Sequence, residues 1–268
     1  MNVHRHALEL PGAHLDIERM PGHWLLARMG KRVLRPGGLE LTRKMLDGLA
    51  IGPDDDVVEL APGLGTTTRL ALTRAPASYV AVDRDEAAVR ATQKVLRPGR
   101  DQCRQGSASS TGLDAASASV VFGEAMLTMQ TGEQKAAIVR EAHRVLRPGG
   151  RYAIHELALV EGLSDGEKAE VERELSASIH VGARPLAASD WRRLLEEGGF
   201  EVLSNLSAPM LLLESARVIA DEGVLGTLRI TANLLANPAA RRRILAMRAV
   251  FRKHAARMCA VALVARRQ

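Results

Sequence analysis

The feature that most constrains this chain is an apolar run that ends in an acid and passes directly into a glycine-bearing turn, at residues 57–68. The apolar residues before Glu59 suit a strand buried on both faces of a parallel sheet. Gly63 and Gly65 let the backbone approach a ligand where a Cβ would collide. The stretch therefore predicts a strand, a nucleotide-binding loop and the start of a helix.

A second apolar run that ends in an acid follows at residues 79–83, and a helical stretch over residues 69–75 separates the two runs. This order of elements is a βαβ unit, whose parallel strands place their carboxyl ends on one edge of the sheet. Asp83 then lies beside the glycine loop, about twenty residues on, where an acid can accept hydrogen bonds from both hydroxyls of a ribose. A nucleoside is the predicted ligand.

The glycine pattern of the loop narrows the kind of nucleoside. A dinucleotide fingerprint needs the pattern Gly-x-Gly-x-x-Gly, but Ala61 occupies one of its glycine positions. An acid followed by Gly63 and Gly65 resembles instead the first motif of the class I S-adenosylmethionine-dependent methyltransferases, usually Asp/Glu-x-Gly-x-Gly-x-Gly, with two of its three glycines present. The loop alone leaves open a tight strand-to-helix turn in another α/β protein.

Two later segments also resemble this family. Residues 141–150 read Glu-Ala-His-Arg-Val-Leu-Arg-Pro-Gly-Gly, close to the helix-to-strand signature of its small-molecule methyltransferases. Residues 191–200 resemble the helix that precedes the sixth strand in this family, Trp-x-x-Leu-Leu-x-x-Ala-Gly-Phe. The resemblance covers residues 38–206 and the final strand.

The resemblance implies an α/β fold, a Rossmann-like three-layer sandwich. Its sheet has seven strands and is mostly parallel with an antiparallel last strand, and helical lid additions accompany it. We expect three parts: an N-terminal helical arm or cap at residues 1–37, which includes an amphipathic helix over residues 21–34; a methyltransferase core at residues 38–206 and 258–268; and a helical lid inserted at residues 207–257.

The resemblance also implies which residues bind S-adenosyl-L-methionine and its product S-adenosyl-L-homocysteine. Glu59 and the loop backbone would hold the methionine portion, Asp83 the ribose, and Ser107 with Ala108 the adenine. Ser107 stands where the family often has an acid, and its hydroxyl can still donate or accept one hydrogen bond. The expected cofactor-binding residues are Glu59, Ala61, Pro62, Gly63, Gly65, Asp83, Arg84, Gly106, Ser107, Ala108, Glu124, Ala125 and Met126.

The exits of the fourth and fifth strands supply the candidate catalytic residues, since both exits face the acceptor in this family. These candidates are His155, Glu156 and Glu124. The ordinary pKa of a histidine suits a general base, whereas a glutamate needs burial to raise its pKa. The alternative for each residue is a hydrogen-bonded structural role. The fourth exit lacks the Asn/Asp-Pro-Pro-Tyr tetrapeptide of enzymes that methylate amino groups of DNA bases, which argues against those substrates.

Composition narrows the class of protein further. The chain has 268 residues, enough for one domain with additions, and no apolar run approaches the length that a bilayer span requires. Residues 1–20 lack the continuous apolar core of a secretion signal, so we expect a cytoplasmic protein. Cys103 and Cys259 are too few for a disulfide framework or a cysteine-based metal site, and no acidic cluster at the strand exits indicates a metal.

The formal charge of +6 is concentrated late in the chain. A solvated helix face is the default interpretation, and a site for an anion or a membrane surface is the alternative. Aromatic residues make up 3% of the chain, too few for the base stacking that binds single-stranded nucleic acid, so nucleic acid is a disfavoured partner. The basic residues of this region are Arg241, Arg242, Arg243, Arg248, Arg252, Lys253 and Arg257.

Together these features predict a methyltransferase that uses S-adenosyl-L-methionine and acts on a small organic acceptor. The apolar richness of residues 207–257 favours ordinary helix packing and leaves a lipophilic acceptor open. Two other hypotheses remain: a catalytically silent protein of the same fold that binds a nucleoside or a lipophilic ligand, and an RNA methyltransferase that uses the arginine cluster. The sequence also leaves a homodimer open.

Overall fold

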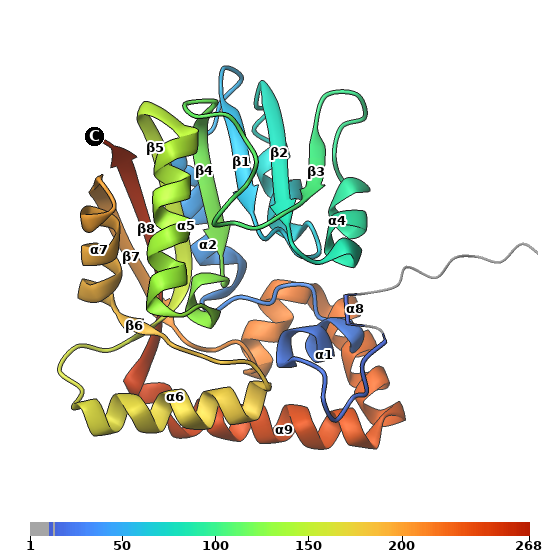
Figure 1. The fold of residues 1–268 in the computed structure, drawn as a ribbon. Coiled ribbons are helices and arrows are strands. Elements are labelled where there is room, and N and C mark those ends of the chain that lie inside the picture. The colour runs from blue at the N-terminus through green and yellow to red at the C-terminus, as the bar shows by residue number, and fades with distance from the viewer. Residues whose placement is uncertain (1–10, 13) are drawn as a thin grey trace, which may run out of the picture.

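The computed structural model describes residues 11–12 and 14–268, and its centre is one mixed β-sheet (Figure 1). The strands are β1 (Asp56–Leu60), β2 (Ser78–Asp83), β3 (Gln102–Gln105), β4 (Ala118–Glu124), β5 (Leu146–Leu159), β6 (Leu186–Ala187), β7 (Phe200–Pro209) and β8 (Met258–Arg267). Their order across the sheet is β3-β2-β1-β4-β5-β8-β7, and β6 pairs with β5 off this path. Strands β1 to β5 pair in parallel, and β8 is antiparallel to both of its neighbours.

The burial of β1 explains why it forms a central strand. Val58 and Leu60 pack into the apolar cluster on one face of the sheet, and Val57 packs into the cluster on the other face. In the register of the sheet, Leu60 lies opposite Val82 on one side and Gly123 on the other. The carboxyl ends of β1, β2 and β4 are therefore level, and the side chains that follow these strands meet at one edge.

Helices cover both faces of the sheet, and others lie beyond its carboxyl edge. The helices of the described residues are α1 (Gly22–Arg28), α2 (Gly38–Leu49), α3 (Thr66–Leu72), α4 (Glu86–Gln93), α5 (Gly132–Val145), α6 (Asp165–Ile179), α7 (Ala188–Glu197), α8 (Ser215–Ala236) and α9 (Pro238–Lys253). Ile138 of α5 and Trp191 of α7 pack on one face, and Met45 of α2 and Ala71 of α3 pack on the other. The Rossmann-like sandwich is confirmed, with its antiparallel last strand, and the short β6 adds a strand beyond the seven expected.

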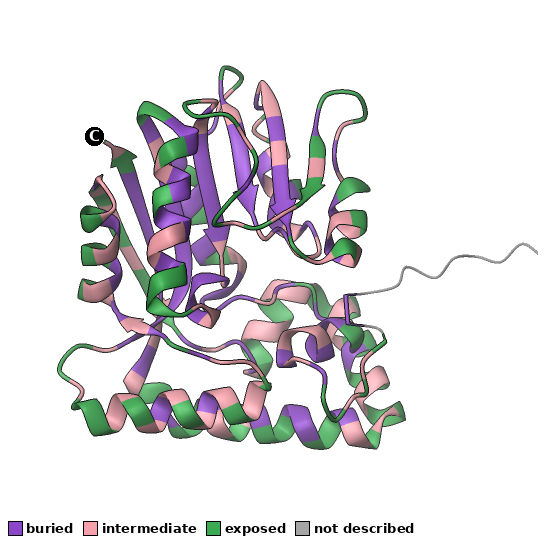
Figure 2. Ribbon diagram, in the orientation of Figure 1, coloured by how far each residue is buried: buried purple, intermediate pink, exposed green. Residues whose placement is uncertain are grey.

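A second core lies beyond the carboxyl edge of the sheet, among α1, α6 and α9 (Figure 1). Leu25, Leu175 and Met247 of these helices pack with Leu157 and Met258 from the sheet. Figure 2 shows buried residues continuing from the strands into this helical layer. The helices therefore enclose space against the edge where the strand-end side chains meet.

The first helix is shorter than the amphipathic pattern over residues 21–34 predicts. It ends at Arg28, and Gly30 follows with a φ of +103°, which a right-handed helix cannot continue through. Residues 31–37 form a loop that leads to α2. Residues 1–10 and 13 of the expected N-terminal arm lie outside the described residues. Within the described residues, no helix combines the length and the apolar character that crossing a bilayer requires.

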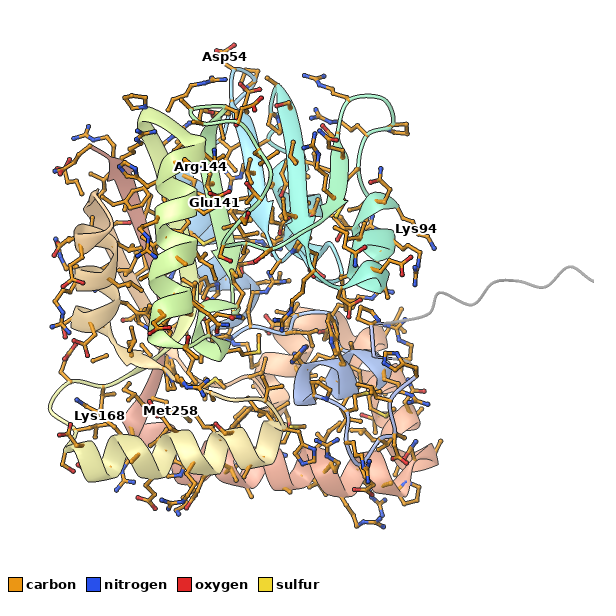
Figure 3. The ribbon with its side chains drawn as sticks, in the orientation of Figure 1. Asp54, Lys94, Glu141, Arg144, Lys168 and Met258 are labelled. Atoms are coloured by element: carbon orange, nitrogen blue, oxygen red, sulfur yellow. The ribbon has the colours of Figure 1, made fainter. Side chains whose placement is uncertain are left out.

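A buried carboxylate on α5, that of Glu141, forms hydrogen bonds with the loop that follows β3 (Figure 3). Glu141 accepts hydrogen bonds from the N–H and the hydroxyl of Thr111 at 2.8 and 2.6 Å, and from Arg144 at 2.7 Å. The hydrogen bond from Arg144 is the largest cause that lowers the pKa of Glu141, to about 2, so the carboxylate is ionised at neutral pH. This anchor holds the loop after β3 near the edge of the sheet.

Candidate active site

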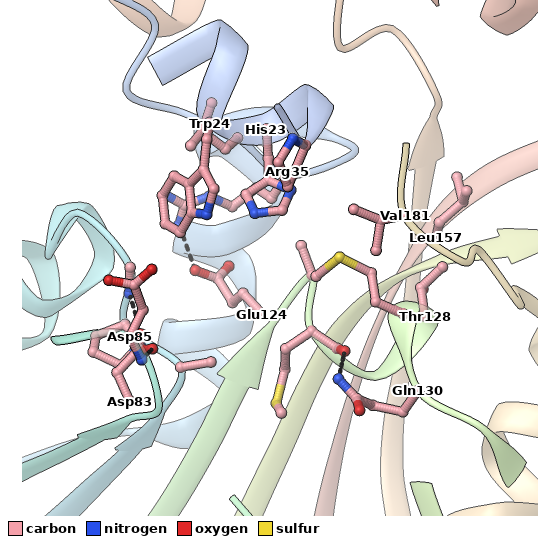
Figure 4. Close-up of a pocket in the computed structure, with 18 of the residues that line it drawn as sticks. His23, Trp24, Arg35, Asp83, Asp85, Glu124, Thr128, Gln130, Leu157 and Val181 are labelled. Atoms are coloured by element: carbon pink, nitrogen blue, oxygen red, sulfur yellow. Dashed lines mark hydrogen bonds and ion pairs between the residues drawn. The ribbon is translucent and has the colours of Figure 1, made fainter. Parts of the chain in front are cut away.

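A cavity of about 460 Å³ opens at the carboxyl edge of the sheet, between the strand ends and helices α1, α6 and α9 (Figure 4). Asp83 and Asp85 lie at one end of the view, and Leu157 and Val181 lie at the other. The cavity therefore joins a polar half at the strand ends to an apolar half under the helices. The apolar half includes Leu157, Leu175, Ile179, Met210, Met247 and Phe251.

The loop between β1 and α3 bends through the left-handed region of backbone space. Gly63 has a φ of +60°, and Ala61 has a φ of +54°. Ala61 therefore adopts, with some strain, a conformation that a glycine takes freely. Its N–H donates to the carbonyl oxygen of Val82 at 2.8 Å, which holds the loop against β2. Ala61 therefore occupies the backbone conformation that favours glycine, although its side chain is not glycine's.

The cavity brings together all the residues expected to bind the cofactor except Gly65. Gly65 is the N-cap of α3, and a Cβ at this position would lie 3.0 Å from Cγ2 of Val95 and 3.4 Å from Cα of Thr92. Its small size serves the packing of the loop against the end of α4. Gly65 thus has a packing role in the loop, and its expected contact with the cofactor stays a prediction.

Asp83 ends β2 with its carboxylate at the cavity. Its Oδ2 accepts the N–H of Gly63 at 3.1 Å, and its Oδ1 accepts the N–H of Asp85 at 3.0 Å. Burial raises the pKa of Asp83, and these backbone hydrogen bonds oppose the rise. Each oxygen can still accept a further hydrogen bond, so the carboxylate is fixed in place and suited to a diol. The neighbouring Arg84 also lines the cavity.

The segment after β3 lies next to Asp83 along the same edge, as the strand order β3-β2-β1 requires. The N–H of Gly106 donates to the carbonyl oxygen of Asp83 at 2.9 Å. The hydroxyl of Ser107 lies 2.9 Å from the hydroxyl of Ser109, and both Ser107 and Ala108 line the cavity. The expected adenine contacts therefore adjoin the expected ribose contact.

Glu59 is the acid of the β1 end, and it is 3% exposed. The hydroxyls of Thr68 and Tyr79 both donate to its Oε2, the second at 2.7 Å. Burial raises the pKa of Glu59 to about 7, although these hydrogen bonds oppose the rise. Among the described residues no donor reaches Oε1, and Glu59 borders the cavity. This oxygen is therefore available to a cationic group of a ligand.

Glu124, at the end of β4, anchors several segments at the cavity wall (Figure 4). It accepts hydrogen bonds from Thr42 at 2.6 Å and His155 at 2.7 Å, and also from Arg35 and Thr67. Burial pushes the pKa of Glu124 upward, but the charge of Arg35 and the hydrogen bond from His155 outweigh it and hold the pKa well below its ordinary value. A carboxylate so stabilised as an anion is a poor general base.

His155 is a candidate base that does not line the cavity. Its side chain is fully buried, with Nε2 at 2.5 Å from the carbonyl oxygen of Pro36 and Nδ1 against Glu124. Both partners are acceptors, so neither ring nitrogen is free to take a proton from a substrate. The geometry therefore favours a structural role for His155, whose ring joins the loop between α1 and α2 to the sheet.

Glu156 is the other candidate base of β5, and it also does not line the cavity. It accepts hydrogen bonds from the N–H groups of Met126, Leu127 and Thr128 at 2.9, 2.7 and 3.0 Å, and from the Thr128 hydroxyl at 2.7 Å. Burial raises the pKa of Glu156, while these donors favour the anion. Its carboxylate shapes the turn after β4, and the turn presents Ala125 and Met126 to the cavity.

Several cavity residues come from the N-terminal part of the chain, where no sequence motif points to a site. Among them are His23 and Trp24 of α1 and Arg35 of the following loop. A Cβ at Gly63 would lie 3.9 Å from the indole of Trp24, so this ring covers the glycine loop. Burial is the largest cause that lowers the pKa of His23 to about 4, which leaves its imidazole neutral at pH 7. An amphipathic pattern predicts such a helix, but it does not predict which of the helix's side chains line the cavity.

Comparison with known proteins adds three findings. A family model described as a methyltransferase domain matches residues 58–154. An uncharacterized protein of Haemophilus influenzae is 32% identical over 219 residues, which are 80% of this chain and 85% of that protein. The structure of MccD protein has a TM-score of 0.69 at 16% identity and covers 87% of this chain and 99% of that one.

A further solved structure is that of geranyl diphosphate C-methyltransferase from Streptomyces coelicolor, in complex with Mg²⁺, geranyl diphosphate and S-adenosyl-L-homocysteine. Its TM-score is 0.59 at 15% identity, over 85% of this chain and 77% of that one. The two solved structures share the fold, and the matched methyltransferase domain spans the strands that carry the glycine loop, Asp83 and Glu124. The chain belongs to the class I S-adenosylmethionine-dependent methyltransferases.

Proposed function

We propose that this protein transfers a methyl group from S-adenosyl-L-methionine to a small, lipophilic organic acceptor. The observation that carries the proposal is the single cavity with a polar half at the strand ends and an apolar half under α1, α6 and α9. Cofactor and acceptor would meet where the halves join, beside Ala125 and Met126. In this proposal residues 207–257 serve as a helical lid, and the described part of residues 1–37 serves as a cap on the core.

The polar half fits the three parts of the cofactor. Asp83 offers the ribose diol a carboxylate that two backbone N–H groups already hold in position. Ser107 and Ala108 border the neighbouring space for the adenine. Glu59 offers its Oε1 to the ammonium of the methionine portion, and the loop at Gly63 brings backbone close to that portion. The order of these groups along the edge follows the order of the strands.

The role of the chain in such a reaction is alignment. When bound, S-adenosyl-L-methionine would supply an electrophilic methyl group for transfer to the acceptor, and S-adenosyl-L-homocysteine would be the product. Holding both reactants in one cavity converts the encounter into an effectively unimolecular step. Trp24 covers the glycine loop, and Glu156 fixes the turn that presents Met126 to the junction.

The walls of the second half favour a lipophilic acceptor. Leu157, Ile179, Met247 and Phe251 offer apolar surface, and burying an apolar molecule there contributes roughly 25 cal/mol per Å². A charged acceptor would lose its hydration without gaining a partner from these side chains. The related Streptomyces coelicolor enzyme was solved with geranyl diphosphate, so a fold of this kind can accommodate a prenyl chain.

A labelling experiment tests the proposal. The protein is incubated with methyl-labelled S-adenosyl-L-methionine and a solvent extract of the cells it comes from, and we expect label in the solvent-soluble fraction. Val181→Phe narrows the apolar half, so the acceptor would be misaligned and transfer should fall about tenfold. The affinity for S-adenosyl-L-homocysteine should stay unchanged.

The matched control is Val160→Phe, which enlarges a half-buried valine outside the cavity. This change should leave transfer unchanged. Cofactor binding without transfer to any extract would instead identify the silent binding protein. Label recovered in RNA would identify an RNA methyltransferase. Either result would overturn the proposal of a lipophilic acceptor.

A further inference from the structure

The segment from residue 223 to residue 257 has an extreme charge pattern. It contains no aspartate or glutamate, while seven of its residues are arginine and one is lysine. It forms most of α8 and all of α9, which are joined by Asn237 alone. The segment therefore carries positive charge with no acid of its own to balance it, since the acids Asp221 and Glu222 of α8 precede it.

All but one of the exposed large apolar side chains of the described residues lie on the same pair of helices; the exception is Leu203 on β7. Leu225 is 83% exposed, Leu228 60% and Leu235 64%, and their spacing places them on one side of α8. Leu245 on α9 is 54% exposed. An apolar stripe of this kind on a soluble protein marks an interaction surface.

Cations border this stripe. Arg229 lies one turn after Leu225 and is exposed, and its Nη2 donates to the carbonyl oxygen of Gly30 at 3.3 Å. Arg241 and Arg242, also exposed, lie near the start of α9, one turn before Leu245, and Arg242 forms an ion pair with Glu18 at 3.8 Å. Further along α9 the cations are paired with acids of other elements, such as Arg252 with Glu214 and Lys253 with Glu174. Among the described residues, the cations without an acid within ion-pair distance on these two helices include Arg229 and Arg241, which lie on the same helices as the exposed leucines.

We infer that this surface docks on an anionic membrane. We define the docking face as Leu225, Leu228, Leu235, Arg229, Arg241 and Arg242. A helix with an apolar stripe bordered by arginines lies in the headgroup region of a bilayer, and its cations add attraction to anionic lipids. A second copy of the chain would set like charges against one another, and RNA would leave the leucines in water.

The position of α9 connects the docking face to the cavity. Met247 and Phe251 of α9 line the apolar half, while Leu245 and Arg241 of the same helix face solvent. Docking therefore brings the wall of the apolar half next to the lipid phase, where a lipophilic acceptor would be dissolved. Docking itself needs neither cofactor nor acceptor, so its test stands apart from that of the proposed function.

Flotation with vesicles tests the inference on the full chain. We expect the protein to float with vesicles of equal parts phosphatidylglycerol and phosphatidylcholine, and to float poorly with phosphatidylcholine alone or at high salt. The double variant Arg241→Gln with Arg242→Gln should bind anionic vesicles about 30-fold more weakly. The double variant Leu225→Gln with Leu228→Gln should weaken binding about tenfold by removing apolar burial.

Matched controls change similar residues elsewhere. Arg192→Gln with Arg193→Gln removes two exposed charges on α7, and Leu203→Gln removes a half-exposed leucine on β7; both should bind vesicles like the wild type. Equal flotation of the docking-face variants and the wild type would overturn the inference. So would a dimer that these leucine changes dissociate, or RNA binding through Arg241 and Arg242 in a protein that ignores vesicles.

Discussion

Glu59, Asp83 and Glu124 end neighbouring strands, yet their surroundings shift their pKa values in different ways. Burial raises the pKa of Glu59 to about 7 and also raises that of Asp83. Burial of Glu124 is outweighed by Arg35 and His155, which hold its pKa low. The strand-end pattern in the sequence identifies all three acids, but their charge depends on partners that lie far away in the chain.

We predict that Glu59→Gln removes a pH dependence of folding stability between pH 4.5 and about 7. An acid whose pKa is raised by folding stays protonated while the unfolded chain ionises, so stability falls as the pH rises from 4.5 to about 7. Glutamine keeps an oxygen for the hydroxyls of Thr68 and Tyr79 but does not ionise. Urea unfolding measures the change. Between pH 4.5 and about 7, the free energy of unfolding of the wild type should fall by roughly 3 kcal/mol more than that of the variant.

The control for this experiment is Glu201→Gln, which changes an exposed carboxylate on β7. Its stability should follow the same dependence on pH as the wild type. Parallel curves for Glu59→Gln and the wild type would mean that Glu59 ionises with an ordinary pKa, in conflict with its burial.

Among the elements, α8 is held by an acid to the loop between α1 and α2. Oε1 of Glu222 accepts the N–H groups of Arg32 and Val33 at 2.8 and 2.9 Å. Gly223 follows with a φ of 71° and a ψ of 173°, so the helix breaks directly after this contact. Because the same loop carries Arg35 to the cavity, the contact couples the position of α8 to the candidate active site.

We predict that Glu222→Ala lowers the free energy of unfolding by roughly 3–5 kcal/mol, since removing one partner of a buried ion pair leaves the other uncompensated. That other partner is Lys31, which is 2% exposed, with its ammonium 3.6 Å from the carboxylate of Glu222. Urea unfolding measures the change. Glu40→Ala, which removes the exposed partner of Lys44, should leave the midpoint nearly unchanged, and a similar midpoint for Glu222→Ala would refute the role of this contact.

The sequence predicts correctly those elements whose own residues form a clear pattern. Strands β1 and β2 are apolar runs that reach an acid near their ends, and each forms within a residue or two of its expected bounds. The end of α1 has no such signal, because Gly30 can lie within a helix or end one. The two-residue β6 depends on pairing with β5 and has no pattern of its own.

At the scale of the whole molecule, the polar half of the cavity is predictable and the apolar half is not. The polar half follows from strand order and a glycine motif, both visible in the sequence. Which strand-exit side chains face the cavity depends on distant contacts, such as that between His155 and Pro36, which are 119 positions apart. The sequence therefore identifies the acids at the edge but leaves open whether His155 and Glu156 are catalytic or structural, and both side chains are buried and hydrogen-bonded within the protein.

The central claim, that the strand-end acids bind the cofactor, is tested most directly by calorimetric titration with S-adenosyl-L-homocysteine. We predict saturable binding to the wild type and binding about tenfold weaker or more to Asp83→Asn, since the ribose loses a hydrogen bond to a charged group. Asp190→Asn on α7 is the control and should bind like the wild type. Equal affinities of Asp83→Asn and the wild type, with both proteins folded, would contradict the account.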